Sequence, residues 1–246
     1  MSNTAIQCNH LTIGYAAHVV QADVSFTLTR GEMVCILGPN GCGKSTLLRT
    51  LAGLLPPLEG TYTLYNIDAT TPSERAKQLA LVLTESLSLE HTTVHDVVAM
   101  GRYPYTSFLG TLSTADEQAI DDALTQVGLR DTLDTYFNNH SDGEKQRILI
   151  AKALAQQTPI ILLDEPTAHL DLPNRIRVLQ LLRQLAHQQG KTVLISTHEL
   201  DLALQLSDRI LLMSDDGLHL DTTANLQCAD AFTRAFKMDI FHPLIG

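Results

Sequence analysis

The sequence predicts an α/β fold with three parts: a core built on a buried sheet, an N-terminal antiparallel β-subdomain and an all-helical insertion. Four segments of strand length are apolar on both faces, as in sheets that helices cover on both sides, at 33–37, 160–163, 192–196 and 210–213. The first 65 residues instead alternate apolar and polar residues, which is typical of half-buried antiparallel strands. Between residues 84 and 158 the apolar spacing is helical, which predicts the insertion.

The individual elements follow from the same patterns. Half-buried strands are expected at Ala5–Ile13, Val19–Leu28 and Thr61–Tyr65. Helices are expected between the buried strands at Ser45–Ala52, Asn174–Gln189 and Glu199–Leu206, with Asp171 as a cap and Pro173 at a first helical position. In the insertion they are expected at Val94–Met100, Thr114–Val127 and Gly143–Ala155. Near the end of the chain, we expect a hairpin turn at Asp216-Gly217 and a closing helix at Ala229–Phe236.

The length of the chain and the short turns between its elements favour one domain over residues 1–246. The 246 residues, 44% of them apolar, supply a substantial core, and the turns between elements are too short for a flexible linker. Within that domain we expect residues 1–84 and 158–246 to form the α/β core and residues 85–157 to form the helical subdomain.

Composition excludes several classes of protein. The formal charge of -10 and a pI near 5.3 argue against a nucleic-acid binder, because such proteins usually carry a basic face. The four cysteines lack a CxxC pair and zinc-ligand spacing, which favours reduced thiols in a cytosolic protein. Neither a signal peptide nor an apolar run near 20 residues is apparent, so we expect a soluble chain without its own membrane anchor.

A phosphate-binding loop follows the first buried strand. The segment Gly38-Pro-Asn-Gly-Cys-Gly-Lys-Ser45 fits GxxxxGK[ST] between a buried strand and a helix. Its glycines let backbone N–H groups point at phosphate oxygens, and the following helix adds its N-terminal dipole. Lys44 can neutralise the β and γ phosphates, and the Ser45 hydroxyl can ligate Mg²⁺. Thr46 can hold the region of the α and β phosphates. We therefore expect ATP and Mg²⁺ to bind at Gly38, Pro39, Asn40, Gly41, Cys42, Gly43, Lys44, Ser45 and Thr46. The alternatives are a glycine-rich turn with an incidental lysine, or a dinucleotide fold, in which Thr46 would block close approach.

Two carboxylates end the buried strand at 160–163. Asp164 is predicted to bind the Mg²⁺ of MgATP, and Glu165 to polarise the attacking water. His198 follows another buried strand, where it can contact the γ-phosphate and hold Glu165 and the water in line. The alternatives are an acidic strand exit and an ordinary surface histidine.

Taken together, these motifs resemble an ATP-binding cassette (ABC) protein, and therefore a P-loop NTPase with a RecA-like core. His140-Ser-Asp-Gly-Glu-Lys-Gln-Arg147 resembles the signature LSGGQ followed by xQR, and Ala168-His-Leu-Asp171 resembles the D-loop. Tyr15 stands where the family stacks an aromatic ring on adenine. The resemblance covers about residues 5–225 and implies ATP hydrolysis.

In this family the signature acts in trans. Each ATP lies between one P-loop and the partner's signature, so the resemblance implies a second cassette in a homodimer or heterodimer, with Ser141, Gly143 and Glu144 contacting the nucleotide. Ser141 and Asp142 are also good helix caps, and the two roles are compatible. The chain departs from the pattern where Asp142 replaces the first glycine and His140 the usual leucine.

The resemblance also implies a Q-loop, but Thr84 stands where the family has its Mg²⁺-ligating glutamine, with Glu85 next. Thr84 is taken as the third expected metal ligand because its spacing places it at the glutamine position. Glu85 is the alternative.

The helical insertion points to a subfamily. Thr93-Val-His-Asp-Val-Val-Ala-Met-Gly-Arg-Tyr-Pro-Tyr105 resembles the cassettes of iron–siderophore, haem and cobalamin importers. Such cassettes energise a transmembrane permease and act indirectly with a solute-binding protein, which implies a location on the inner face of the membrane. Tyr103, Tyr105 and Phe108 are expected either to dock a permease helix or to belong to the subdomain core.

Other functional classes fit less well. A soluble mechanochemical ATPase acting on DNA or ribosomes usually carries coiled-coil insertions or two cassettes, and the charge disfavours nucleic acid. A P-loop kinase or GTPase lacks the signature segment, and a non-enzymatic module would not need Lys44, Glu165 and His198 together.

Overall fold

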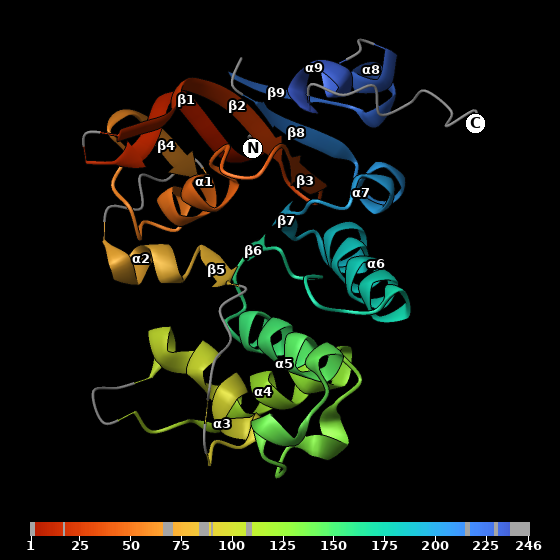
Figure 1. Cartoon of the computed structure of the whole chain (residues 1–246). Helices are drawn as coiled ribbons and strands as arrows, with labels where there is room; N and C mark the ends of the chain where they lie inside the picture. Colours follow the sequence, from red (N-terminus) through yellow and green to blue (C-terminus); the bar gives the residue numbers. More distant parts are fainter. Residues whose placement is uncertain are drawn as a thin grey trace, which may run out of the picture.

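The computed structural model describes residues 3–16, 18–65, 71–83, 89, 91–106, 110–214, 217–228 and 231–236. Two sheets and their covering helices form an upper lobe, and helices alone form a lower lobe (Figure 1). The sheets have strand orders β2-β1-β4 and β5-β6-β7-β3-β8-β9. This is the α/β fold that the sequence predicts.

The smaller sheet is antiparallel, with β1 (Thr4–Tyr15) between β2 (His18–Thr29) and β4 (Glu59–Leu64). Its apolar side chains face the larger sheet and helix α1 and form one core with them, including Ile6, Leu28 and Leu47. Bulges interrupt β1 where its register shifts. The predicted half-buried strands are confirmed within three residues at each end.

The larger sheet forms the centre of the upper lobe. Its first five strands are parallel, and the sixth runs antiparallel to β8. They are β3 (Met33–Leu37), β5 (Leu79–Val82), β6 (Ile160–Asp164), β7 (Thr192–Ser196), β8 (Arg209–Ser214) and β9 (Gly217–Asp221). The four predicted buried strands are confirmed, whereas β5 has only four residues and was not predicted. The β8–β9 pairing confirms the hairpin, although Asp216 lies outside the described residues.

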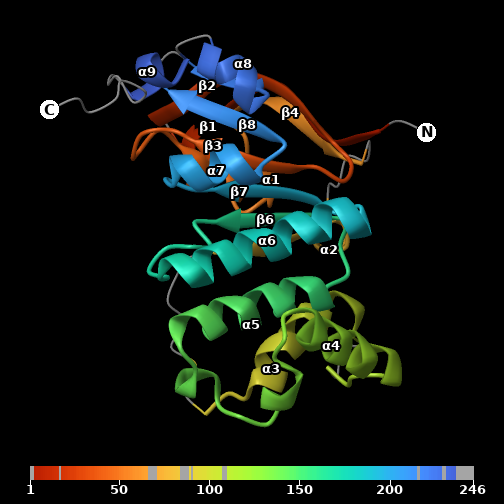
Figure 2. The same ribbon diagram turned by 90° about the vertical axis from the view of Figure 1, so that its right-hand side faces the viewer.

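Helices cover the larger sheet (Figure 2). They are α1 (Lys44–Leu51), α2 (Pro72–Ala76), α6 (Leu172–Gln189), α7 (Leu200–Leu206), α8 (Thr223–Cys228) and α9 (Ala231–Phe236). Asp171 caps α6 by accepting the N–H of Asn174, as predicted, whereas Pro173, predicted at the first helical position, is the second residue of the helix. The predicted closing helix at Ala229–Phe236 corresponds to α9, which begins at Ala231. The preceding helix α8 was not predicted.

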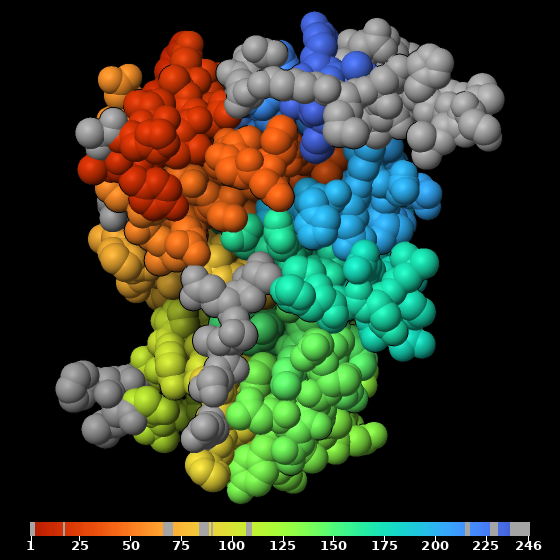
Figure 3. All heavy atoms as spheres, in the orientation of Figure 1, coloured from red at the N-terminus to blue at the C-terminus, as the bar shows by residue number. Residues whose placement is uncertain are grey.

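The lower lobe consists of helices and short 3₁₀ turns (Figure 1), and its yellow-green and green residues fill the lower half of the space-filling view (Figure 3). They are α3 (Val94–Ala99), η1 (Met100–Tyr105), α4 (Thr114–Gln126), η2 (Arg130–Thr132), η3 (Phe137–Asn139) and α5 (Asp142–Ala155). Capping boxes begin α3, α4 and α5. The three predicted helices are confirmed, and their apolar faces join the core beneath the sheet. The subdomain boundary at residue 84 lies outside the described residues, so that division stays a prediction.

Arg102 ties this lobe together. Its buried guanidinium contacts Asp116 Oδ1 through Nε at 2.8 Å, and its Nη1 donates to the Ala155 carbonyl at 2.6 Å and to Gln157 Oε1 at 3.0 Å. Bonds from Ser113, and then from Arg102, lower the pKa of Asp116 to about 2. Arg102 therefore joins η1, α4 and the C-terminal end of α5.

Candidate functional site

The phosphate-binding loop connects β3 to α1 at the carboxyl edge of the larger sheet. A Cβ atom at Gly38 would collide with the carbonyl oxygen of Met213 on the neighbouring strand. Gly43 has φ +106°, and a Cβ there would press against Val20. Glycine is therefore required at both positions, by close packing and by a left-handed backbone.

Lys44 lies inside this loop. Its side chain is buried, and Nζ donates to the carbonyl oxygens of Gly38 at 2.8 Å and Pro39 at 3.0 Å. An ammonium group has three donors, so one remains beyond these two bonds. The loop thus folds around a buried positive charge at the predicted phosphate position.

Ser45 and Asp164 meet as the sequence predicts for a metal site. Ser45 Oγ donates to Asp164 Oδ1 at 2.9 Å, and the Asp164 side chain is buried at the end of β6. Mg²⁺ is usually held by one or two protein oxygens together with substrate phosphates, so this pair of oxygen donors fits the ion of MgATP. Thr84, the third expected ligand, and Glu85 lie outside the described residues.

Glu165 leaves the strand in a left-handed conformation, with φ +45°. This backbone costs a non-glycine residue about 1–3 kcal/mol and needs support from its surroundings. Its N–H is shared between the carbonyl oxygen of Ser196 at 3.1 Å and Ser196 Oγ at 2.9 Å. Its carboxylate lies near His198, with 3.7 Å from Oε2 to Nδ1, so the structure brings these two predicted residues together.

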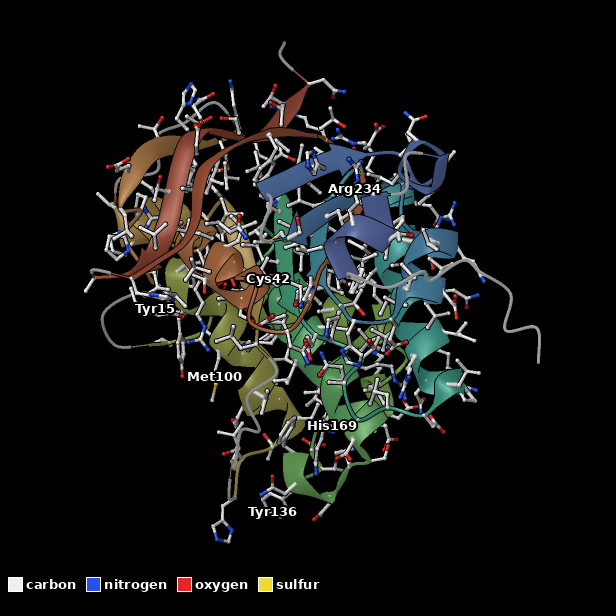
Figure 4. The ribbon with its side chains drawn as sticks, turned by 45° about the horizontal axis from the view of Figure 1, so that its top comes forward. Tyr15, Cys42, Met100, Tyr136, His169 and Arg234 are labelled. Atoms are coloured by element: carbon white, nitrogen blue, oxygen red, sulfur yellow. The ribbon has the colours of Figure 1, made fainter. Side chains whose placement is uncertain are left out.

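A cavity of about 310 Å³ extends from the phosphate-binding loop to Glu165. The β1–β2 end supplies Tyr15, which is half exposed, and two residues that the sequence analysis missed, His18 and Val20. Figure 4 shows Tyr15 at the outer end of the antiparallel sheet and Cys42 in the phosphate loop. The other lining residues are all predicted site residues, namely Asn40, Gly41, Gly43, Lys44, Ser45, Thr46 and Glu165.

The signature segment lies elsewhere, at the N-terminus of α5. Ser141 caps the helix, and Glu144 completes a capping box: its Oε2 accepts the Ser141 hydroxyl at 2.8 Å and the Ser141 N–H at 3.0 Å. These bonds lower the pKa of Glu144. The capping role of Ser141 is confirmed, whereas contact of Ser141, Gly143 and Glu144 with nucleotide stays a prediction. Asp142 is exposed in the first turn.

Gly143 has a packing role. A Cβ there would come 2.9 Å from Cγ of Asn174, in the first turn of α6. The signature turn therefore packs against the helix that follows the D-loop. From that helix, Arg175 donates to the Leu170 carbonyl at 2.6 Å and lies 3.4 Å from Glu199, next to His198.

The fold and the phosphate loop define a P-loop protein with a RecA-like core and a helical insertion. The sequence profile of the ABC transporter family matches residues 21–168. The chain belongs to that family, whose members bind and hydrolyse ATP.

Two relatives illustrate the similarity. The probable siderophore transport system ATP-binding protein of Bacillus subtilis is 38% identical over 90% of this chain and 81% of its own length. The iron(3+)-hydroxamate import ATP-binding protein of the same organism is 32% identical over 96% of this chain and 88% of its own length.

Solved structures agree with the fold. An inward-facing putative metal-chelate type ABC transporter superposes with TM-score 0.86 at 32% identity, over 96% of this chain and 90% of the other. A dimeric ATP-binding cassette in a post-hydrolysis state, bound to ADP and phosphate, gives 0.76 at 27% identity, over 89% of this chain and 98% of the other. Among the residues that the structure describes, no helix is long and apolar enough to cross a membrane.

Proposed function

We propose that this chain is the ATPase subunit of an importer for iron–siderophore, haem or cobalamin. In this proposal it pairs with a second copy of itself, docks on transmembrane permease subunits at the inner face of the membrane, and serves a solute-binding protein indirectly. The cavity that unites the phosphate loop with Glu165 supports the ATPase role, and the siderophore and hydroxamate transport functions of the relatives support the transport role.

Within each cassette, the phosphate loop binds and orients ATP. Lys44 holds the β and γ phosphates, and Tyr15 packs against the base. Ser45 and Asp164 are the residues that hold Mg²⁺, which when bound neutralises charge on the phosphates. Their hydroxyl and carboxylate already lie 2.9 Å apart.

Glu165 and His198 act on the attacking water. The Glu165 carboxylate orients the water and accepts its proton, because it lines the cavity beside Lys44 and Ser45. His198 holds that carboxylate in place from 3.7 Å. The signature of the second copy, with Ser141 and the N–H of Gly143, completes the site around the γ-phosphate.

The permease contact is proposed at η1. The Tyr103 side chain is 62% exposed, whereas the Tyr105 hydroxyl donates to the Gln156 carbonyl and its ring stacks with Arg102 at 4.2 Å. Tyr103 therefore suits docking and Tyr105 supports the subdomain, while Phe108 lies outside the described residues. A cavity of about 270 Å³ that includes Leu54 and Gln156 lies next to this turn.

Uptake measurements test the proposal. The gene is deleted in the source organism, and uptake of radiolabelled iron–siderophore, haem and cobalamin is measured. We expect uptake of one chelate to fall to background and to return with the wild-type gene. Glu165→Gln should not restore it, because we expect the variant to bind MgATP without hydrolysing it and to accumulate as an undissociated dimer. Glu59→Gln, which changes an exposed carboxylate on β4, should restore it fully.

Two results would contradict the proposal. Normal uptake of all three chelates in the deletion strain would remove the import role and favour a mechanochemical ATPase. Restoration of uptake by Glu165→Gln would remove Glu165 from catalysis. Tyr103→Ser refines the partner assignment: we expect reduced uptake with the ATPase rate of the purified subunit unchanged, and wild-type uptake would exclude Tyr103 from the permease contact.

A further inference from the structure

Ser196, the last residue of β7, occupies a position that the proposed mechanism does not use. It is fully buried and lies opposite Asp164 in the parallel β6–β7 register. Its hydroxyl donates to Asp164 Oδ1 at 2.6 Å and accepts the N–H of Glu165 at 2.9 Å. One side chain therefore contacts both members of the acidic pair.

These two bonds hold different parts of the site. At Asp164, the Ser196 hydroxyl and the Ser45 hydroxyl share the same oxygen, so Ser196 fixes the carboxylate in the orientation that faces Ser45. At Glu165, the bond to the N–H supports the left-handed turn that directs its side chain into the nucleotide cavity. Without the hydroxyl, the Glu165 N–H keeps the backbone carbonyl of Ser196 as its acceptor within the described residues, at 3.1 Å.

We propose that Ser196 is a positioning residue that sets the metal-binding carboxylate and the water-activating carboxylate together. The inference rests on the roles proposed above for Asp164 and Glu165. It requires a hydroxyl at residue 196, because only a group that both donates and accepts can serve the Asp164 carboxylate and the Glu165 N–H at once.

The test compares Ser196→Ala with Ser196→Thr in the full-length protein. In Ser196→Ala we expect kcat to fall about 10- to 100-fold, because small displacements of catalytic groups have effects of this size. In EDTA, the affinity for a fluorescent ATP analogue should change less than about twofold. The Mg²⁺ concentration that gives half of the Mg²⁺-dependent increase in that affinity should rise severalfold. Ser196→Thr keeps the hydroxyl and should restore most of both properties.

Thr192→Val is the matched control. Thr192 is a fully buried residue at the opposite end of β7, and its hydroxyl donates to the Thr29 carbonyl at 3.2 Å, away from the site. We expect it to lower the melting temperature without changing the Mg²⁺ dependence. A general weakening of β7 would instead give Thr192→Val and Ser196→Ala the same Mg²⁺ dependence, which would overturn the inference.

Two further outcomes separate this inference from the proposed function. Wild-type kcat and Mg²⁺ dependence in Ser196→Ala, with Glu165→Gln inactive, would overturn the inference and leave the catalytic assignments intact. An active Glu165→Gln would overturn those assignments themselves. If Ser196→Ala does not fold, Ser196→Thr decides: a folded protein that needs severalfold more Mg²⁺ than the wild type contradicts the role of the hydroxyl, and near-normal dependence supports it.

Discussion

The phosphate loop and the signature segment are held in different ways. Lys44, Asp164 and Ser196 are buried, and Asp164 bonds to Ser45, 119 residues away, and to Ser196, 32 residues away, so that these bonds join α1, β6 and β7. Ser141 and Glu144 bond to each other within one helical turn, and Ser141 is exposed. In the function proposed above, one half of the nucleotide site would therefore be built inside the chain, whereas the other half would present a local structure to the second copy.

The largest expected effect tests the buried half. Lys44→Ala removes the positive charge enclosed by the phosphate loop, so MgATP hydrolysis should fall about 100-fold or more, because a preorganised group next to the transferred phosphate is lost. A coupled phosphate-release assay measures this. Lys145→Ala, which removes a lysine from the signature helix, should stay within about threefold of wild type. Equal losses in both variants would erase the proposed contrast between the two regions.

The next effect concerns the stability of the lobe that carries the signature. Arg102→Met leaves Asp116 buried without its cation and should lower the free energy of unfolding by about 3–5 kcal/mol in urea denaturation. Arg130→Met breaks the exposed pair with Asp121, which solvent screens, and should lower the free energy of unfolding far less than Arg102→Met. A loss for Arg102→Met no larger than that for Arg130→Met would contradict a tying role for Arg102.

The contribution of Asp116 to stability should depend on pH. The folded pKa of Asp116, about 2, lies below its ordinary value of 3.8. Its stabilising contribution is therefore complete above pH 3.8 and is lost as the pH falls towards 2. Ser113→Ala should weaken this acid dependence most, because the Ser113 bond is the largest cause of the shift. An acid dependence unchanged by Ser113→Ala would contradict this assignment.

The smallest expected effect tests the exposed half. Glu144→Gln keeps a residue able to complete the capping box and removes one negative charge from the end of α5 where the phosphate is proposed to dock. The KM for ATP should fall about two- to fivefold, in proportion to about 0.3–1 kcal/mol for a charge at a helix terminus. Glu74→Gln changes the same motif in α2 and should leave KM unchanged. A higher KM in Glu144→Gln would mean that the carboxylate assists binding.

Sequence patterns predicted the parts of the molecule whose signal is local. The apolar strands, the phosphate loop and the cap at Asp171 each depend on neighbours in the chain, and the structure agrees with them. The four-residue β5 was too short to produce a periodic signal. Ser196 was predicted as a strand end, but its bonds to Asp164 and Glu165 depend on strand register, which no local pattern contains. The partners of Arg102 are similarly distant, up to 55 residues away.

Helix α5 connects the signature segment to the end of the lower lobe that Arg102 holds. At 1.5 Å per residue its 14 residues span about 21 Å, with the signature at one end and the carbonyl of Ala155, gripped by Arg102, at the other. A tilt of about 10° around the gripped end would move Ser141 by roughly 4 Å, more than the length of a hydrogen bond. In the proposed dimer, a tilt of this size would be enough for the signature to engage or release a nucleotide held on the second copy.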